Sequence, residues 1–189
     1  MNRAGDGAQA ETVLTRLLEK QGPSSETYSV LGRVYKDRWE EASKDSRLHY
    51  LARGLLDKAI DAYVRGFEAD WRDAYPGINA VTLMELRDQP DPRQQQLLPV
   101  VAYAVERRIA AGKPDYWDHA TRLELAVLAR DEAKAESALA NALAVVREPW
   151  EPETTARNLR LIREARQQRH TSTPWATQME EVLLEKAKA

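Results

Sequence analysis

The sequence predicts an all-α fold, and three observations lead to this prediction. Alanine, leucine, arginine and glutamate, which all form helices readily, are abundant along the 189 residues. Apolar side chains recur three and four residues apart in successive segments, which is the spacing of one face of a helix. Most of the 8 glycines and 9 prolines fall between these segments. The chain is long enough to bury a core built mainly from leucine, alanine, valine, tyrosine and tryptophan.

Capping residues and chain breaks predict the first two helices. Residues 1–10 are small and polar and are predicted to form a flexible tail. An amphipathic helix is predicted over 11–21, and a Gly-Pro pair ends it. Ser24 or Ser25 can cap a second helix, which runs to about residue 41, because a serine hydroxyl accepts from the free amides of a first turn.

The next helices are predicted from the same signals. The partner of the second helix is expected over 54–69, and a further helix over 76–88 starts at a proline, whose missing amide proton costs nothing there. A helix over 93–111 contains Pro99, which predicts a kink or a later start near Leu97. The remaining helices are a pair around Trp117 and Ala133 and two C-terminal helices, over 153–168 and 174–187.

The residue spacing in the second helix and its partner resembles a tetratricopeptide repeat, in which two antiparallel helices pack through small residues. Leu31, Gly32 and Tyr35 have the offsets of the first helix, and Ala59 and Tyr63 those of the second. Between Tyr35 and Ala59 lie 23 residues, where an ordinary repeat has about eight. The extra residues, around 42–56, are predicted to lengthen the first helix or to add a turn and a loop. The predicted fold is a tetratricopeptide-like, right-handed stack of about eight antiparallel helices, forming a single domain over 11–189.

Composition narrows the function classes. The net charge is −2 and the isoelectric point is about 6.0, which disfavours nucleic-acid binding, because such domains usually concentrate basic residues. The absence of cysteine excludes disulfides and thiol chemistry and suits a reducing cytosol. No apolar run approaches the ~20 residues of a membrane span, and the N-terminus lacks a signal peptide. A cytoplasmic protein without a membrane segment is expected.

Neither catalysis nor a cofactor is predicted. The chain lacks the G-x-S-x-G nucleophile motif and both glycine-rich phosphate-binding motifs. Its three histidines, His49, His119 and His170, are too far apart in sequence for a typical zinc motif. His119 lies beside Asp115 and Asp118, but the simpler interpretation is that Asp115 caps a helix and His119 is partly buried. No metal site is expected.

Several collinear stretches resemble the TRAF-binding domain family, a region upstream of the kinase domain in apoptosis signal-regulating kinases. They are Gly-Arg-Val-Tyr-Lys-Asp-Arg-Trp (32–39), Asp-Lys-Ala-Ile-Asp-Ala-Tyr-Val-Arg-Gly-Phe-Glu (57–68), Tyr-Pro-Gly-Ile-Asn-Ala-Val-Thr-Leu (75–83), Tyr-Trp-Asp (116–118), Leu-Ala-Arg-Asp (128–131) and residues 150–162, which end in Asn-Leu-Arg-Leu-Ile. The resemblance covers about 25–168 and implies a tetratricopeptide-like scaffold for protein interactions in signalling. The chain contains no kinase domain, and its alanine- and arginine-rich composition favours a stand-alone bacterial version.

Two groups of polar residues are candidates for partner binding. Arg33, Lys36, Asp37 and Arg38 form a charged cluster on the second helix. Arg33 and Asp37 are one turn apart and can form an ion pair that ties this helix to the inserted segment. Alternatively the cluster anchors a partner on the inner face of the stack, where helical repeats receive peptides. Asn79 lies on an apolar helix face, and its amide needs a partner on a neighbouring helix or on a bound peptide.

An arginine-rich segment, 153–169, is the second group. Its arginines recur every three residues, so they wind around a helix and do not form one straight stripe. They are Arg157, Arg160, Arg163, Arg166 and Arg169. A solvated face is the simpler interpretation, and contact with phosphate or an acidic partner is the alternative.

The leading prediction is a non-catalytic scaffold that binds a protein partner in a signalling, stress or defence assembly. A first alternative is a homodimer formed through an exposed apolar face of the last helix, with Trp175, Met179, Val182 and Leu183. A weaker alternative is nucleic-acid or nucleotide-signal binding through 153–169, which predicts an affinity that falls steeply with salt.

Overall fold

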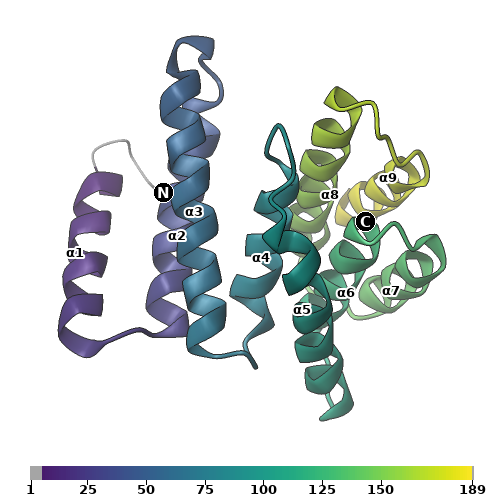
Figure 1. The fold of residues 1–189 in the computed structure, drawn as a ribbon. Helices are drawn as coiled ribbons and strands as arrows, with labels where there is room; N and C mark the ends of the chain where they lie inside the picture. The colour runs from purple at the N-terminus through teal and green to yellow at the C-terminus, as the bar shows by residue number, and fades with distance from the viewer. Residues whose placement is uncertain (1–5, 189) are drawn as a thin grey trace. The chain divides into compact units, whose positions relative to one another are not determined.

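The computed structural model describes residues 6–188 and is all-α, with nine α-helices, one short 3₁₀-helix and no strand in that range (Figure 1). This confirms the predicted all-α stack. Contacts divide the chain into two compact units, Met1–Leu83 and Met84–Ala189, and each is described by itself. The single domain over 11–189, the right-handed sense and the tetratricopeptide-like character stay predictions.

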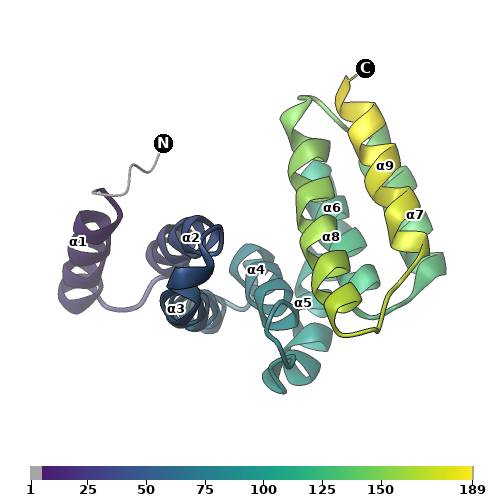
Figure 2. The same ribbon diagram turned by 90° about the horizontal axis from the view of Figure 1, so that it is seen from above.

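The first unit contains α1 (Asp6–Gln21), α2 (Ser25–Ala42), the 3₁₀-helix η1 (Ser46–Leu48), α3 (His49–Ala69) and most of α4 (Ala74–Glu85). In both views α2 and α3 lie side by side, with α1 on one side of this pair and α4 on the other (Figures 1 and 2). One face of α2 is therefore directed toward α1, and another face is directed toward α4.

Two expectations about the first unit need correction. Helix α1 begins at Asp6, so residues 6–10 belong to a helix and not to a tail, while 1–5 lie outside the described residues. The inserted residues do not extend α2, which ends at Ala42. They form η1 and the first turns of α3, which begins at His49 and not at residue 54. The predicted serine cap is confirmed, because the Ser24 hydroxyl accepts from the Thr27 amide at 3.1 Å.

A glycine allows α2 and α3 to approach closely. A Cβ atom at Gly32 would lie 2.9 Å from three ring carbons of Tyr63, a distance that side chains do not tolerate. Tyr63 is 1% exposed, and Ala59 and Ile60 beside it are fully buried. The small residue predicted from the repeat spacing at the helix contact is therefore used in that way.

The second unit contains α5 (Arg93–Ala110), α6 (Tyr116–Leu128), α7 (Glu132–Ala144), α8 (Trp150–Gln168) and α9 (Trp175–Lys188). Helices α6 and α7 pack together, as do α8 and α9, which run side by side in Figure 2. Helix α5 includes Pro99 and begins at Arg93, so the later start near Leu97 is wrong. The Tyr116 hydroxyl donates to Thr155 Oγ1 at 2.8 Å and links α6 to α8.

Candidate protein-interaction site

The charged cluster predicted on α2 is divided between two faces of that helix. Successive residues of an α-helix are rotated by about 100°, so residues five apart differ by about 140°. Arg33 contacts Tyr75 of α4, whereas Arg38 contacts Glu11 of α1. Lys36 and Asp37 are half-buried, and both interact within the chain. The four residues therefore do not form a single binding surface.

On the side of α4, Arg33 is held against a tyrosine. Its Nη2 donates to the Tyr75 hydroxyl at 2.9 Å, and the guanidinium carbon lies 6.0 Å from the centre of the Tyr75 ring. The Tyr75 ring packs edge-on against Tyr63, with ring centres 6.3 Å apart. The hydrogen bond that Arg33 donates to Tyr75 raises the pKa of Arg33 above its ordinary value, so the guanidinium stays charged.

A groove lies beside this pair, with a volume of about 330 Å³. We call it the α2–α4 groove, and its lining residues are Glu26, Ser29, Val30, Arg33, Asp73 and Tyr75. Val30 is 46% and Tyr75 41% exposed, so the groove presents apolar surface to solvent. Helical spacing places Glu26, Ser29, Val30 and Arg33 on one face of α2.

Two polar side chains of the α2–α4 groove, Asp73 and Ser29, differ in the hydrogen bonds that they form. Asp73 accepts from the Ser25 hydroxyl at 2.7 Å and from the Tyr75 amide at 3.1 Å, and the second bond caps the start of α4. The hydroxyl of Ser29, by contrast, is buried without a hydrogen-bond partner among the described residues. Buried polar groups are usually paired, so this hydroxyl is an unused donor and acceptor in the groove.

Arg33 also differs from most other arginines of the described chain. Eleven others form an ion pair with a carboxylate: Arg38, Arg47, Arg72, Arg87, Arg93, Arg108, Arg122, Arg160, Arg163, Arg166 and Arg169. Arg33 has a phenol as its hydrogen-bond partner and forms no ion pair within residues 6–188. Asp37, one turn further on, adds only a smaller electrostatic attraction. Arg33 therefore places a positive charge in the groove that no carboxylate pairs directly within residues 6–188, although Glu26 and Asp73 also line the groove.

Asn79 does not serve the predicted purpose. Its amide donates to the carbonyl oxygen of Tyr75 in its own helix at 2.9 Å, and the residue is half-buried. The predicted bond to a neighbouring helix or to a peptide is not needed, because the carbonyl one turn earlier already accepts from this amide.

On the side of α1, a single carboxylate holds three helices together. Glu11 accepts from the Tyr35 hydroxyl at 2.8 Å, from Arg38 at 2.5 Å and from Lys58 of α3 at 3.0 Å. Burial alone would raise the pKa of Glu11, but the hydrogen bonds from Lys58, Tyr35 and Arg38 outweigh it and hold the pKa below its usual value. Burial, together with the bond to Glu11, raises the pKa of Tyr35 to about 12. Arg38 therefore stabilises the attachment of α1.

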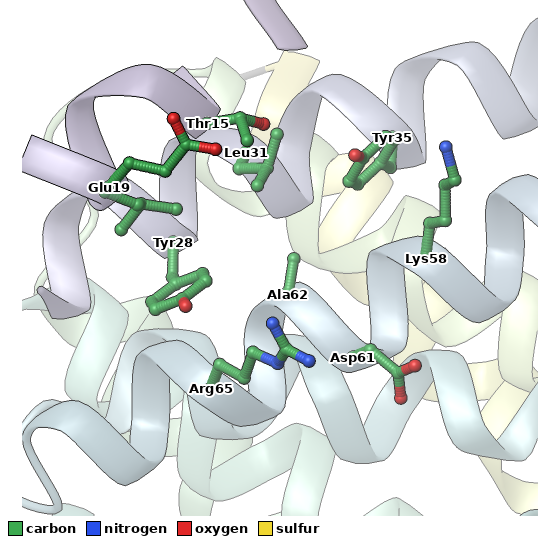
Figure 3. A pocket seen from close by; sticks show the side chains of 10 residues that line it. Thr15, Glu19, Tyr28, Leu31, Tyr35, Lys58, Asp61, Ala62 and Arg65 are labelled. Atoms are coloured by element: carbon green, nitrogen blue, oxygen red, sulfur yellow. The ribbon is translucent and has the colours of Figure 1, made fainter. Parts of the chain in front are cut away.

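A larger cavity, of about 470 Å³, lies between α1, α2 and α3 (Figure 3). Tyr35 and Lys58 are at one end of this α1 cavity, and Tyr28 and Arg65 are at the other. Tyr35 and Lys58 both donate to Glu11, and the Lys58 ammonium lies 5.2 Å from the Tyr35 ring centre. Because its polar groups at that end are already paired, we assign the cavity to the packing of α1.

The arginine-rich segment holds the second unit together. Arg166 is 1% exposed and donates to Glu85, to the carbonyls of Val127 and Leu128, and to Thr173. These carbonyls lie in the last turn of α6, where backbone carbonyls lack the usual helical partner four residues later, so the guanidinium helps to cap the helix. The prediction that Arg166 contacts phosphate or an acidic partner is wrong, because no partner can reach a fully buried side chain.

The neighbouring arginines of α8 are also engaged. Arg160 and Arg163 donate to the two carboxylate oxygens of Glu180 in α9, at 2.7 and 3.0 Å. Arg169 donates to Glu85 and to the carbonyl of Arg87. Arg157 is exposed and interacts within the chain. The simple solvated face is therefore incorrect as well, because most of this segment binds neighbouring helices.

The predicted dimer surface on α9 is covered within the chain. Met179 is 5% and Leu183 0% exposed, and Trp175 and Val182 are half-buried. The exposed apolar face on which that alternative depends is therefore not available in the described structure. This finding corrects the proposed surface and leaves the oligomeric state itself as a prediction.

The region of His119 matches the simpler interpretation. Asp115 and Asp118 form a capping box at the start of α6, and His119 is 7% exposed, with an unpaired Nδ1 atom among the described residues. Within residues 6–188, no three histidine, cysteine, aspartate or glutamate side chains gather as ligands for a metal ion. In the same range, no helix has both the length and the apolar character needed to cross a membrane.

Comparison with known proteins identifies the family. The family model described as the MAP3K TRAFs-binding domain matches residues 1–182. The chain belongs to this family. It is also 32% identical over 149 residues to mitogen-activated protein kinase kinase kinase nsy-1 of Caenorhabditis elegans. That match covers 76% of this chain and 10% of nsy-1, so the chain spans about a tenth of the length of this relative.

Five residues that line the groove of this MAP3K TRAFs-binding domain were not predicted as site residues: Glu26, Ser29, Val30, Asp73 and Tyr75. Ser29 and Val30 precede Arg33 by four and three residues, which is the spacing of one helix face. A search for polar and apolar residues one turn from Arg33 would have found them. Nothing in the sequence indicates that Tyr75, 42 residues later, lies against Arg33.

Proposed function

We propose that this MAP3K TRAFs-binding domain is a non-catalytic interaction module that binds a segment of a protein partner in the α2–α4 groove. The observation that carries this proposal is the Arg33–Tyr75 pair at a groove that also contains the unpaired hydroxyl of Ser29. The groove combines apolar surface with a few polar groups, which is the usual composition of a binding site.

Family membership supports a protein as the partner, because the family description names a domain that binds TRAF proteins. The kinase activity in the name of the relative is a property of nsy-1, and this chain matches only 10% of that protein. For this chain we propose a partner within a signalling, stress or defence assembly, without assigning it to the TRAF proteins.

Affinity capture with matched variants tests the proposal. The domain is immobilised as wild type, Arg33→Glu and Arg53→Glu, and each form is exposed to lysate of the source organism. Arg53 is exposed on α3 and lies outside both cavities, so Arg53→Glu makes the same change in charge as Arg33→Glu without altering the groove. A protein partner retained by wild type and Arg53→Glu, but lost from Arg33→Glu, is the expected result. A partner retained equally by all three forms would place the binding site elsewhere.

The described residues offer no specific surface for self-association through α9. The apolar side chains of α9 that would form the dimer pack inside the second unit. Light scattering measures the oligomeric state directly, and a monomer over the working concentration range is the expected result.

A further inference from the structure

We propose that the α2–α4 groove selects a short extended segment that places an aspartate or glutamate side chain against Arg33 and Tyr75. This inference rests on the proposed function and adds the chemistry of the partner. It commits to a carboxylate carried by a side chain of the partner, and not to a phosphate or to a chain terminus.

The charge of Arg33 is the first argument. A guanidinium has five N–H donors, and the structure assigns one hydrogen bond, to the Tyr75 hydroxyl. That bond and the contact with the Tyr75 ring fix the position of the side chain before any partner arrives. A carboxylate is the natural acceptor for the remaining donors, since arginine binds carboxylates through two parallel hydrogen bonds. Little entropy is lost because the guanidinium is already held in place.

The other charges of the groove limit the anion to a single negative charge. Glu26 and Asp73 line the same groove as Arg33, so the three side chains sum to one excess negative charge. A phosphate with nearly two negative charges would be repelled by these carboxylates more strongly than a carboxylate would be. A segment whose acidic residue faces Arg33, and whose neighbouring positions are neutral or basic, fits this distribution best.

The apolar residues and the Ser29 hydroxyl define the rest of the segment. Val30 and Tyr75 offer exposed apolar surface on opposite helices, suited to one apolar side chain of the partner. Ser29 lines the groove, and its hydroxyl, which has no partner within residues 6–188, can bond a backbone group of an extended segment. A volume of about 330 Å³ is near the lower limit for ligand pockets, so only a few residues of the segment enter it.

Selection from a random peptide library tests the chemistry directly. Twelve-residue peptides are displayed within a loop of a carrier protein, so that none has a free terminus. They are selected on wild type, Arg33→Glu and Arg53→Glu. On wild type and Arg53→Glu we expect enriched peptides to share an acidic residue at a fixed distance from an apolar one. On Arg33→Glu we expect a basic residue at the acidic position, because the charge at the groove is reversed.

Synthetic peptides then distinguish the sources of negative charge. Replacing the shared acidic residue by its amide should weaken binding to wild type about tenfold or more, and should have little effect on Arg33→Gln. A phosphoserine at that position should bind more weakly than the acid. Tighter binding of the phosphopeptide, or enrichment of the same peptides on wild type and Arg33→Glu, would overturn the proposal.

Substitution of Ser29 separates a binding role from a structural one. Ser29→Ala removes a hydroxyl that has no partner among the described residues, so the free domain should keep its melting temperature or gain stability. The affinity for the selected peptide should fall several-fold, since one hydrogen bond to the segment is lost. An unchanged affinity would count against the assigned role of Ser29.

Failure of this inference can be distinguished from failure of the proposed function. If no peptide with an acidic residue is enriched, while the native partner is still lost from Arg33→Glu, the acidic segment is wrong and the groove remains the binding site. If the native partner is also retained by Arg33→Glu, the proposed function fails together with the inference.

Discussion

Arg33 of α2 and Arg166 of α8 carry the same functional group in opposite situations. Arg166 is 1% exposed and bonds a carboxylate, two backbone carbonyls and a hydroxyl. Arg33 is exposed and bonds a single phenol beside a groove. An arginine whose three side-chain nitrogen atoms all bond groups of its own chain, as in Arg166, stabilises the fold. An arginine that is positioned but left without a counter-charge is available for a partner.

Replacing each arginine by methionine should give the largest difference. Arg166→Met leaves the buried Glu85 with fewer partners and removes the cap from α6, so the free energy of unfolding should fall by about 3–5 kcal/mol. Arg33→Met should change it by less than about 0.5 kcal/mol, because no buried group loses a partner. Chemical denaturation measures both values. Equal losses for the two variants would show that Arg33 is structural as well.

The helix contact beneath the groove gives the next effect. Gly32→Ala places a Cβ atom 2.9 Å from the ring of Tyr63, the residue that also supports Tyr75, and should cost about 1–3 kcal/mol. Gly54→Ala, in an open part of α3, should instead stabilise the domain by about 0.5–1 kcal/mol. Thermal unfolding of the two variants tests this. A stable Gly32→Ala variant with normal partner binding would show that the close approach of α2 and α3 is not required.

Glu11 lies on α1, against the face of α2 that is directed away from α4. The substitution Glu11→Gln should weaken the attachment of α1. The amide cannot accept from Tyr35, Arg38 and Lys58 as a charged carboxylate does, so α1 should lose about 1 kcal/mol of local stability. Hydrogen exchange should become faster in α1 and remain unchanged in α6–α9. Glu19→Gln is the matched control, since Glu19 lines the same cavity without belonging to the Glu11 cluster. Slow exchange in α1 of Glu11→Gln would contradict this role.

Acid should produce the same effect, but more gradually. The pKa of Glu11 is lower in the folded domain than in the unfolded chain, so its contribution to stability is fully present above the unfolded value, about 4.3. That contribution is lost as pH falls through the folded pKa, because the protonated acid no longer pairs with Arg38 and Lys58. Exchange rates in α1, measured between pH 6 and 3 and corrected for intrinsic rates, should rise only at the acidic end. In Glu11→Gln this rise should be absent.

Much of the fold follows from local signals in the sequence. The Ser24 cap and the small residue at Gly32 act within one turn or one helix pair, and both were predicted correctly. The starts of two helices were placed too late, because α4 begins at Ala74 and not at Pro76, and α8 begins at Trp150 and not at residue 153. The start of α1 was missed because small polar residues also form a first helical turn. The inserted segment was misassigned because the sequence does not show which of two helices an insertion extends.

The site was less predictable, because its properties depend on residues far apart in sequence. Arg33 was identified, but the partner that positions it lies 42 residues later. Arg166 was assigned to a surface because its partner Glu85 is 81 residues away, so the pairing cannot be recognised from spacing. Arg38 was grouped with Arg33 although their five-residue spacing places them about 140° apart around α2. Its partner Glu11 lies 27 residues earlier in the sequence.

Titration of the captured partner against two single-charge variants determines whether the partner binds in the α2–α4 groove. Arg33→Gln and Arg160→Gln each neutralise one guanidinium, the first in the α2–α4 groove and the second in the ion pair with Glu180. Calorimetry should show binding weakened about tenfold or more by Arg33→Gln and changed less than about twofold by Arg160→Gln. Unchanged affinity for Arg33→Gln, or a larger loss for Arg160→Gln, would contradict the assignment of partner binding to the α2–α4 groove.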